Sequence, residues 1–240
     1  NVVLSVQNLQ VEDDRGAIAV RNVSFEMRAG EILGIAGVDG NGQRELADAI
    51  TGVRTVKGGK IELTRNPSPQ AGVGYIPEDR QKMGLVLQFN IAQNLILKAF
   101  KKLPFCHRFL LHKEAISNNA KSAMQEFDIR ATSEGVKVSQ LSGGNQQKVV
   151  LARELAREPM LIVAMQPTRG LDVGATQAVQ LQLLAQRDRG AAILYISTEL
   201  EEVMAISDRI AVMYRGEFVG VLDATTATVE EIGFLMGGGR

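Results

Sequence analysis

The chain has 240 residues, with 27 basic and 27 acidic side chains and no formal net charge at pH 7. This length suits one globular domain with a substantial core and room for an added lobe. The charge balance gives no electrostatic case for nucleic acid or anionic lipid, and the single cysteine, Cys106, excludes an internal disulfide and fits a reducing cytosol.

Short apolar runs predict eight strands, and helical periodicity predicts four helices between them. The strands are expected at Leu4–Leu9, Val20–Met27, Ile32–Ala36, Val73–Ile76, Leu161–Met165, Ala192–Ser197, Ile210–Tyr214 and Phe218–Leu222. The helices are expected at Gln43–Thr51, Lys113–Phe127, Asn145–Arg157 and Ala175–Arg189. This alternation favours an α/β fold with a mainly parallel sheet. The early strands lack a long crossover between them, which predicts an antiparallel flank.

The region from about residue 85 to residue 134 has little strand signal and more helical pattern. It indicates a helical lobe inserted into the core. We therefore expect a single domain over residues 1–240, with a core of residues 1–84 and 158–240 and a helical lobe at about 85–157. No apolar run approaches the ~20 residues that a membrane span needs. The chain begins at Asn1 rather than Met, so we expect it to be an excised piece.

A glycine-rich loop follows the third predicted strand and precedes a predicted helix. It reads Gly37-Val38-Asp39-Gly40-Asn41-Gly42-Gln43-Arg44. Strand, loop and helix in this order, with the spacing G-x-x-x-x-G-K-[ST], are typical of a phosphate-binding loop (P-loop). The chemistry differs, because Gln43 stands at the lysine position and Arg44 at the position of the hydroxyl that holds Mg²⁺.

The candidate nucleotide-binding residues in this loop are Gly37, Asp39, Gly40, Asn41, Gly42, Gln43 and Arg44. A simple turn with glycines for tight packing is the alternative. A dinucleotide fingerprint fits poorly, because the glycines run G-x-x-G-x-G rather than G-x-G-x-x-G.

The second motif is the octet Leu141-Ser142-Gly143-Gly144-Asn145-Gln146-Gln147-Lys148. Ser142 is a preferred N-cap for the helix that follows. Glycines let the backbone approach a bulky anion, and the first helical turn presents unpaired N–H groups to it. The helical pattern places Val149, Ala152 and Ala156 on one face, with Lys148, Arg153 and Glu154 largely outside it. Arg153 and Arg157 are accordingly expected to be solvated charges. An ordinary capped helix is the alternative for a Ser-Gly-Gly start alone.

The octet resembles the signature motif of ABC-type ATPases, in the form seen in sugar-importer ATPases. Nearly the whole chain resembles the second ATP-binding half of tandem ATPases from simple-sugar and nucleoside importers. Besides the signature, the resemblance rests on Gly30–Gly37, Gly74–Arg80 and Gln166–Asp172. The glycine-rich loop leans towards the nucleoside-type members.

The chain departs from this family where ATP would be hydrolysed. Met165 and Gln166 stand where family members have Asp and Glu, and methionine is no ligand for a hard metal ion. Thr198 replaces a histidine against the γ-phosphate, and the adenine-stacking aromatic is missing ahead of Ala19. Removing one preorganised electrostatic group typically costs ~10²–10³ in rate. We therefore expect no useful ATP turnover at this P-loop and no metal ion bound there.

The resemblance implies a division of labour between two cassettes that face head to tail. Ser142, Gly143 and Gly144, with Asp172 from the D-loop-like Gly170-Leu171-Asp172, would serve an ATP held by a partner ABC half of the same polypeptide. ATP is the expected cofactor, with Mg²⁺ at the partner's site. Integral membrane permease subunits are the other expected partners, which would place the chain at the cytoplasmic face of the plasma membrane. No nucleic acid partner is expected.

Two alternatives stay open. Arg44 could replace the lost cation in an active ABC ATPase, or the chain could be an ABC-type scaffold unrelated to transport. Pro77-Glu78-Asp79-Arg80 stands where many ABC units have a glutamine loop, and no such glutamine is evident. Residues 84–97 would line a cleft for a permease helix or simply pack the lobe. His107 and His112 lack a carboxylate or thiol cluster, so no zinc site is predicted.

Overall fold

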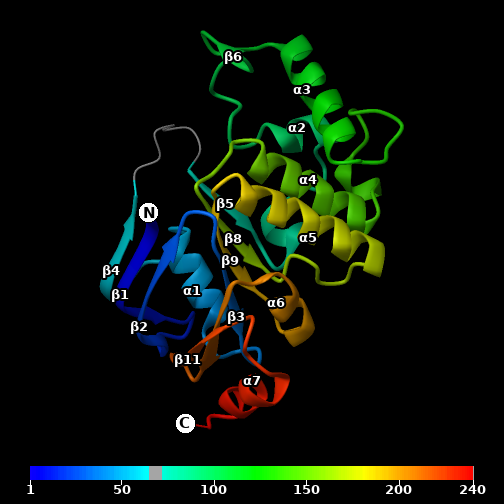
Figure 1. The fold of residues 1–240 in the computed structure, drawn as a ribbon. Helices are drawn as coiled ribbons and strands as arrows, with labels where there is room; N and C mark the ends of the chain where they lie inside the picture. Colours follow the sequence, from blue (N-terminus) through cyan, green and yellow to red (C-terminus); the bar gives the residue numbers. More distant parts are fainter. Residues whose placement is uncertain (65–71, 240) are drawn as a thin grey trace. The chain divides into compact units, whose positions relative to one another are not determined.

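The computed structural model describes residues 1–64 and 72–239 (Figure 1). They form two compact units, which we describe separately. Unit 1 contains Asn1–Tyr75, Glu158–Gln166 and Gln180–Arg240, and unit 2 contains Ile76–Arg157 and Pro167–Val179.

Unit 1 carries two sheets. The larger has six strands in the order β11-β10-β3-β9-β8-β5. Its strands are β3 (Ile32–Ala36), β5 (Val73–Ile76), β8 (Leu161–Met165), β9 (Ala192–Ile196), β10 (Arg209–Tyr214) and β11 (Glu217–Asp223). The pairs β10–β3, β3–β9 and β8–β9 are parallel, and β11 is antiparallel to β10.

The smaller sheet is antiparallel, in the order β2-β1-β4. Its strands are β1 (Val2–Glu12), β2 (Ile18–Arg28) and β4 (Gly58–Leu63). The predicted mainly parallel sheet with an antiparallel flank is thereby confirmed. β4 was not predicted, because its two leading glycines and alternating charges hide the strand signal.

Helix α1 (Gln43–Ile50) contacts β1, β2 and β8, so it packs between the two sheets. Its Leu46 lies in a core with Leu33 from β3 and Val163 from β8. Short helix α6 (Leu200–Ile206) packs on β3, and α7 (Val229–Met236) packs on β10. Because β3, β8 and β9 are buried at all five positions, their sequences are continuous apolar runs.

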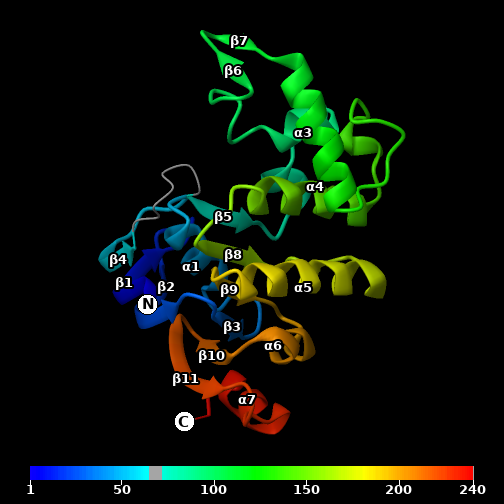
Figure 2. The ribbon, with the colours of Figure 1, turned by 45° about the horizontal axis from the view of Figure 1, so that its top comes forward.

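Unit 2 is mainly helical, as predicted (Figure 2). It contains the π-turn η1 (Arg80–Gly84), the short 3₁₀ turn η2 (Val138–Gln140) and the helices α2 (Ile91–Leu95), α3 (Lys113–Glu126) and α4 (Gly143–Leu155). The first part of α5 (Val173–Asp188) also belongs to it. A hairpin of β6 (Cys106–His107) and β7 (Leu110–Leu111) was not predicted, since two-residue strands carry no usable periodicity.

Residues 76–84 and 167–179 group with unit 2. Side-chain hydrogen bonds connect both segments to α4. Gln81 Nε2 donates to Gln146 Oε1 at 3.0 Å. Gln147 Nε2 donates to the carbonyl oxygen of Pro167 at 2.7 Å.

The expected exposure of α4 is wrong at three positions. Arg153 and Glu154 are buried, at 6% and 1% exposure. The Glu154 carboxylate accepts from Lys98 Nζ at 2.5 Å and from Arg153 Nε at 2.9 Å, so charge is matched inside the lobe. Ala156, expected on the buried face, is exposed as the residue that ends the helix. Over residues 1–64 and 72–239, no helix combines the length and hydrophobicity needed to cross a bilayer.

Candidate functional site

Three neighbouring strands of unit 1 end beside one another. Strands β3, β9 and β8 are adjacent and parallel, so their carboxyl ends lie at one edge of the sheet. The P-loop follows β3, Thr198 follows β9 and Gln166 follows β8. Ligands of open α/β sheets bind at such an edge. The topology thus brings together the predicted nucleotide-binding loop and two of the replaced catalytic positions.

The P-loop has a fixed backbone. Gly40 and Gly42 have φ of +85° and +101°, a region that other residues rarely adopt. A Cβ on Gly42 would lie 2.3 Å from the carbonyl oxygen of Ala19. Asn41 anchors the loop to the β10–β11 turn, since its Oδ1 accepts from the N–H of Arg215 at 2.7 Å and its carbonyl accepts from the N–H of Gly216 at 2.9 Å.

Gln43 fills the interior of this loop. Its side chain is 5% exposed. The Nε2 group donates to the carbonyl of Val38 at 3.0 Å, and Oε1 accepts from the N–H of Asn41 at 3.1 Å. P-loops hold phosphates with backbone N–H groups, and here the protein's own amide occupies one of those donors. Asp39, also predicted to bind nucleotide, is exposed.

Arg44 turns towards Asp48, along its own helix. Arg44 Nε lies 3.8 Å from Asp48 Oδ2, and the arginine side chain is 53% exposed. The buried Asp48 carboxylate also accepts from the hydroxyl of Tyr75 at 3.1 Å. Burial and the neighbouring Asp48 charge raise the pKa of Tyr75 above its ordinary value. Arg44 thus already has a carboxylate partner within unit 1.

The replaced catalytic positions pair with each other. Gln166 is buried, with φ of +48°, and its Nε2 donates to Thr198 Oγ1 at 3.2 Å. The N–H of Thr198 lies 3.4 Å from Gln166 Oε1. Met165 packs into the hydrophobic core. In the described ranges no three His, Cys, Asp or Glu residues form a metal-binding group. Met165 and Gln166 offer no carboxylate oxygen to a metal ion.

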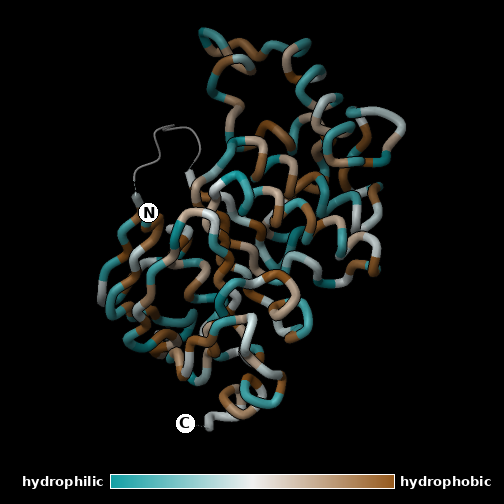
Figure 3. Tube along the Cα trace, in the orientation of Figure 1, coloured by the Kyte–Doolittle hydropathy of each residue, from teal (hydrophilic) through white to brown (hydrophobic). Residues whose placement is uncertain are grey.

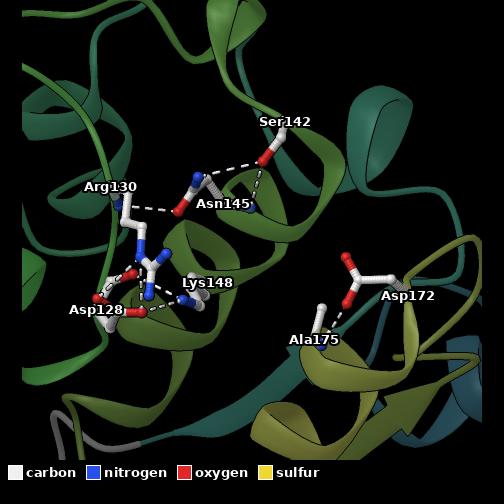
Figure 4. Close-up of polar contacts among 7 residues, drawn as sticks. All are labelled: Asp128, Arg130, Ser142, Asn145, Lys148, Asp172 and Ala175. Carbon is white, nitrogen blue, oxygen red and sulfur yellow. Dashed lines mark hydrogen bonds and ion pairs between the residues drawn. The ribbon is translucent and has the colours of Figure 1, made fainter.

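The signature octet in unit 2 starts α4 as predicted (Figure 4). Ser142 is the N-cap, and its Oγ accepts from Asn145 N at 3.4 Å and from Asn145 Nδ2 at 3.2 Å. Asn145 Oδ1 in turn accepts from the N–H of Arg130 at 2.8 Å. The first N–H groups of a helix have no intrahelical acceptor, so those of Gly143 and Gly144 are available to an anion.

The outer side of α4 is fastened to the loop after α3. Lys148 Nζ donates to Asp128 Oδ2 at 2.8 Å and to the Asp128 carbonyl at 2.7 Å (Figure 4). Hydrogen bonds from Lys148 and then from Arg130 lower the pKa of Asp128 below its ordinary value. These contacts tie the start of α4 to the loop after α3.

Asp172 lies just before α5 in unit 2, the unit that also contains the signature helix. Its Oδ1 accepts from the N–H of Ala175 at 2.8 Å, which fixes the start of α5 (Figure 4). A Cβ on Gly144 would stand 3.4 Å from the Cβ of Ala175, so α4 and α5 approach each other closely at this point. The structure thus brings the D-loop-like segment and the signature into one compact unit.

Arg80 is a site residue that sequence reasoning missed. A Cβ on Gly143 would lie 2.6 Å from Arg80 Nη2. Arg80 Nη1 donates to the carbonyl of Arg169 at 3.0 Å, and Arg169 forms an ion pair with Glu78. The Pro77–Arg80 segment therefore contacts both the signature and the segment before Asp172. No local sequence pattern predicts a contact between parts of the chain that are far apart in the sequence.

Gly143→Ala is expected to push Arg80 away from the Arg169 carbonyl. The lost charged hydrogen bond should lower the free energy of unfolding by about 1–2 kcal/mol, because the guanidinium end can move without straining the backbone. The urea unfolding midpoints of Gly143→Ala, Arg80→Ala and the double variant measure this. A non-additive cycle, with coupling above roughly 0.5 kcal/mol, is expected. Additive effects would show that the two residues do not interact.

Comparison with known proteins identifies relatives of the whole chain. A family model described as ABC transporter matches residues 20–169. The nucleoside import ATP-binding protein NupA of Lactococcus lactis subsp. cremoris (strain MG1363) is 44% identical, over 100% of this chain and 49% of its own length. The guanosine import ATP-binding protein NupO of Bacillus subtilis (strain 168) is 46% identical, over 98% of this chain and 48% of its own length. The ribose import ATP-binding protein RbsA of Lactococcus lactis subsp. cremoris (strain SK11) is 37% identical, over 100% of this chain and 49% of its own length. The chain thus spans about half the length of these curated relatives.

Solved structures share the fold. A dimeric ATP-binding cassette bound to ADP and Pi matches with a TM-score of 0.77 at 21% identity, covering 92% of this chain and 98% of the other. A nucleotide-free ATP-binding cassette from an ABC transporter also matches with a TM-score of 0.77 at 21% identity, covering 99% and 96%. The ABC cassette fold predicted from the sequence is confirmed.

Proposed function

Because the chain belongs to the ABC transporter family, we propose that it is the ATP-binding cassette of an importer for nucleosides or simple sugars. Within the importer it is the degenerate member of a cassette pair. It lends Ser142, Gly143, Gly144 and Asp172 to an ATP held by its partner cassette. Its own loop, from Gly37 to Arg44, forms a second site without hydrolysis. The partner's site takes the Mg²⁺.

One observation carries this proposal: the signature helix and the P-loop of this chain differ in the groups that they offer to ATP. The signature helix keeps its cap and two N–H groups that can meet a phosphate. The P-loop has its interior filled by Gln43, and Gln166 and Thr198 bind each other where a base and a histidine are needed. A chain with this combination can complete another cassette's site, while its own site lacks the groups for phosphoryl transfer.

Each alternative has less support. An active site built on Arg44 requires a free cation facing the phosphates, whereas Arg44 lies against Asp48. A scaffold unrelated to transport has less support, because the similar curated proteins are import ATP-binding proteins. Relatives that import nucleosides share 44% and 46% identity with this chain, and the ribose importer shares 37%, which favours a nucleoside as the solute.

Partners and location follow from the same relatives. Those proteins are about twice as long as this chain, which supports a partner cassette in the same polypeptide. A cassette of an importer works with integral membrane permease subunits. The chain is then held at the cytoplasmic face of the plasma membrane through the permease, as one ABC domain with its helical lobe.

The purified chain with Mg-ATP is expected to release phosphate no faster than its Ser142→Arg variant. The physical reason is the absence of a metal carboxylate, a base and a P-loop lysine at the same site. A coupled phosphate assay measures the rate, with Gln43→Ala as a second variant that empties the loop without adding a catalytic group. Turnover near 1 s⁻¹, the low end of ordinary enzyme rates, would refute the proposed degeneracy.

A further inference from the structure

The zero net charge of the whole chain conceals one segment of a single sign. Between Asp79 and Glu114 the sequence contains no acidic residue. Residues 99–113, which we call the basic hairpin, carry four basic side chains: Lys101, Lys102, Arg108 and Lys113. None of these four forms an ion pair with any residue that the structure describes, whereas nearby Lys98 is neutralised by Glu154. The segment therefore presents uncompensated positive charge.

The turn of the hairpin has a strained backbone and exposes the side chain of Phe109. Cys106 pairs with Leu111 and His107 with Leu110, which leaves Arg108 and Phe109 as the turn. Both have positive φ, 48° and 68°, in a position where Asn and Gly are preferred. Strain of this kind concentrates at functional sites. Phe109 is fully exposed at the tip, with a relative exposure of 101%.

Three more apolar side chains of the basic hairpin are exposed. Leu103, Leu110 and Leu111 are exposed at 69%, 73% and 52%. Figures 1 and 2 place the hairpin at the end of unit 2 away from α4, and Figure 3 shows hydrophobic and hydrophilic residues interleaved along it. Soluble proteins rarely leave apolar side chains gathered in water unless they meet a partner.

We propose that the basic hairpin binds the surface of an anionic phospholipid bilayer. Phe109 and the leucines would enter the boundary between headgroups and acyl chains, while the lysines and Arg108 meet the phosphates. Aromatic and leucine side chains flanked by Lys and Arg are the composition of membrane-interfacial segments. A nucleic acid would use the cations but gives exposed leucines nothing to contact. A protein groove would bury a continuous face, and here the apolar groups form a projecting tip.

This inference goes beyond the proposed function, which concerns ATP and a permease. It is tested with vesicles that hold neither, so the failure of one idea leaves the other standing. The chain contains no tryptophan, so Phe109→Trp introduces a single fluorescent reporter at the tip. Vesicles of phosphatidylcholine mixed with phosphatidylglycerol should shift its emission to the blue, and a quencher on the lipid chains should quench it. Vesicles of phosphatidylcholine alone should do neither at the same concentration.

Two controls make the result specific. Phe234→Trp, on α7 and 62% exposed, carries a matched reporter outside the hairpin and should show neither shift nor quenching. Adding Lys101→Gln and Lys102→Gln to the Phe109→Trp chain should weaken vesicle binding roughly 30-fold, from the typical contribution of each lysine near an anionic surface. An unchanged emission with anionic vesicles, an equal response to neutral ones, or a response only to an added oligonucleotide would overturn the proposal.

Discussion

Ser142→Arg in the assembled transporter is expected to reduce ATP hydrolysis and solute uptake by at least about 10²–10³-fold. The exposed Ser142 hydroxyl lies at the start of α4 next to the N–H groups of Gly143 and Gly144. In the proposed head-to-tail pair these donors would face the γ-phosphate on the partner half, where charge shifts during phosphoryl transfer. A long arginine side chain would fill that space.

The matched variants separate this role from a general disturbance. Gln43→Ala should leave most of the activity, because the P-loop of this chain does no chemistry in the proposed arrangement. Ser133→Arg adds the same side chain at another exposed serine of unit 2 and should be nearly silent. Initial rates of phosphate release and uptake of labelled solute, at equal expression, decide the matter. If Gln43→Ala abolishes transport while Ser142→Arg spares it, the proposed division of labour is reversed.

Gly42→Ala is expected to destabilise the fold by about 3 kcal/mol and to lower the unfolding temperature by roughly 10 °C. Two costs combine at this position. Its φ of +101° strains any residue with a Cβ, and that Cβ would lie 2.3 Å from the Ala19 carbonyl oxygen, which belongs to a paired strand and cannot move freely.

Gly40→Ala is the control that separates the steric cost at Gly42 from the conformational cost. Gly40 also has a positive φ, of 85°, but a Cβ added there would have no neighbouring atom within 4 Å. The Gly40→Ala variant should therefore lose only about 1–2 kcal/mol of its free energy of unfolding, the cost of placing a Cβ at a positive φ. Calorimetry on both variants, with the parent chain alongside, measures the difference. Equal losses would mean that the close approach of the loop to β2 is absent in solution.

Sequence reasoning succeeded where the signal is local. The P-loop and the signature each consist of a short run whose spacing, glycines and following helix are legible without the rest of the chain. The parallel strands were equally legible, because burial on both faces makes β3, β8 and β9 continuously apolar. These features predicted the ABC cassette fold, which solved structures confirm.

It failed where a side chain depends on a distant partner. Glu154 is buried because Lys98, 56 residues away, neutralises it, and no helical pattern contains that information. Arg80 meets Gly143 only through the folding of unit 2. The inward orientation of the Gln43 side chain likewise depends on the carbonyl of Val38 and the N–H of Asn41. The sequence therefore showed that glutamine stands at the lysine position, but not that its side chain fills the loop.

Gln43 has one more consequence, for the way this cassette responds to its surroundings. In a working P-loop the nucleotide completes the hydrogen bonds of the loop, so the folded state gains stability as ligand concentration rises. Here the amide of Gln43 accepts from one loop N–H group, that of Asn41, and donates to the carbonyl of Val38. In the proposed arrangement, nucleotide would therefore add less stability to this loop than to the partner's loop. The dependence of the melting temperature on ATP concentration would then come mainly from the partner site.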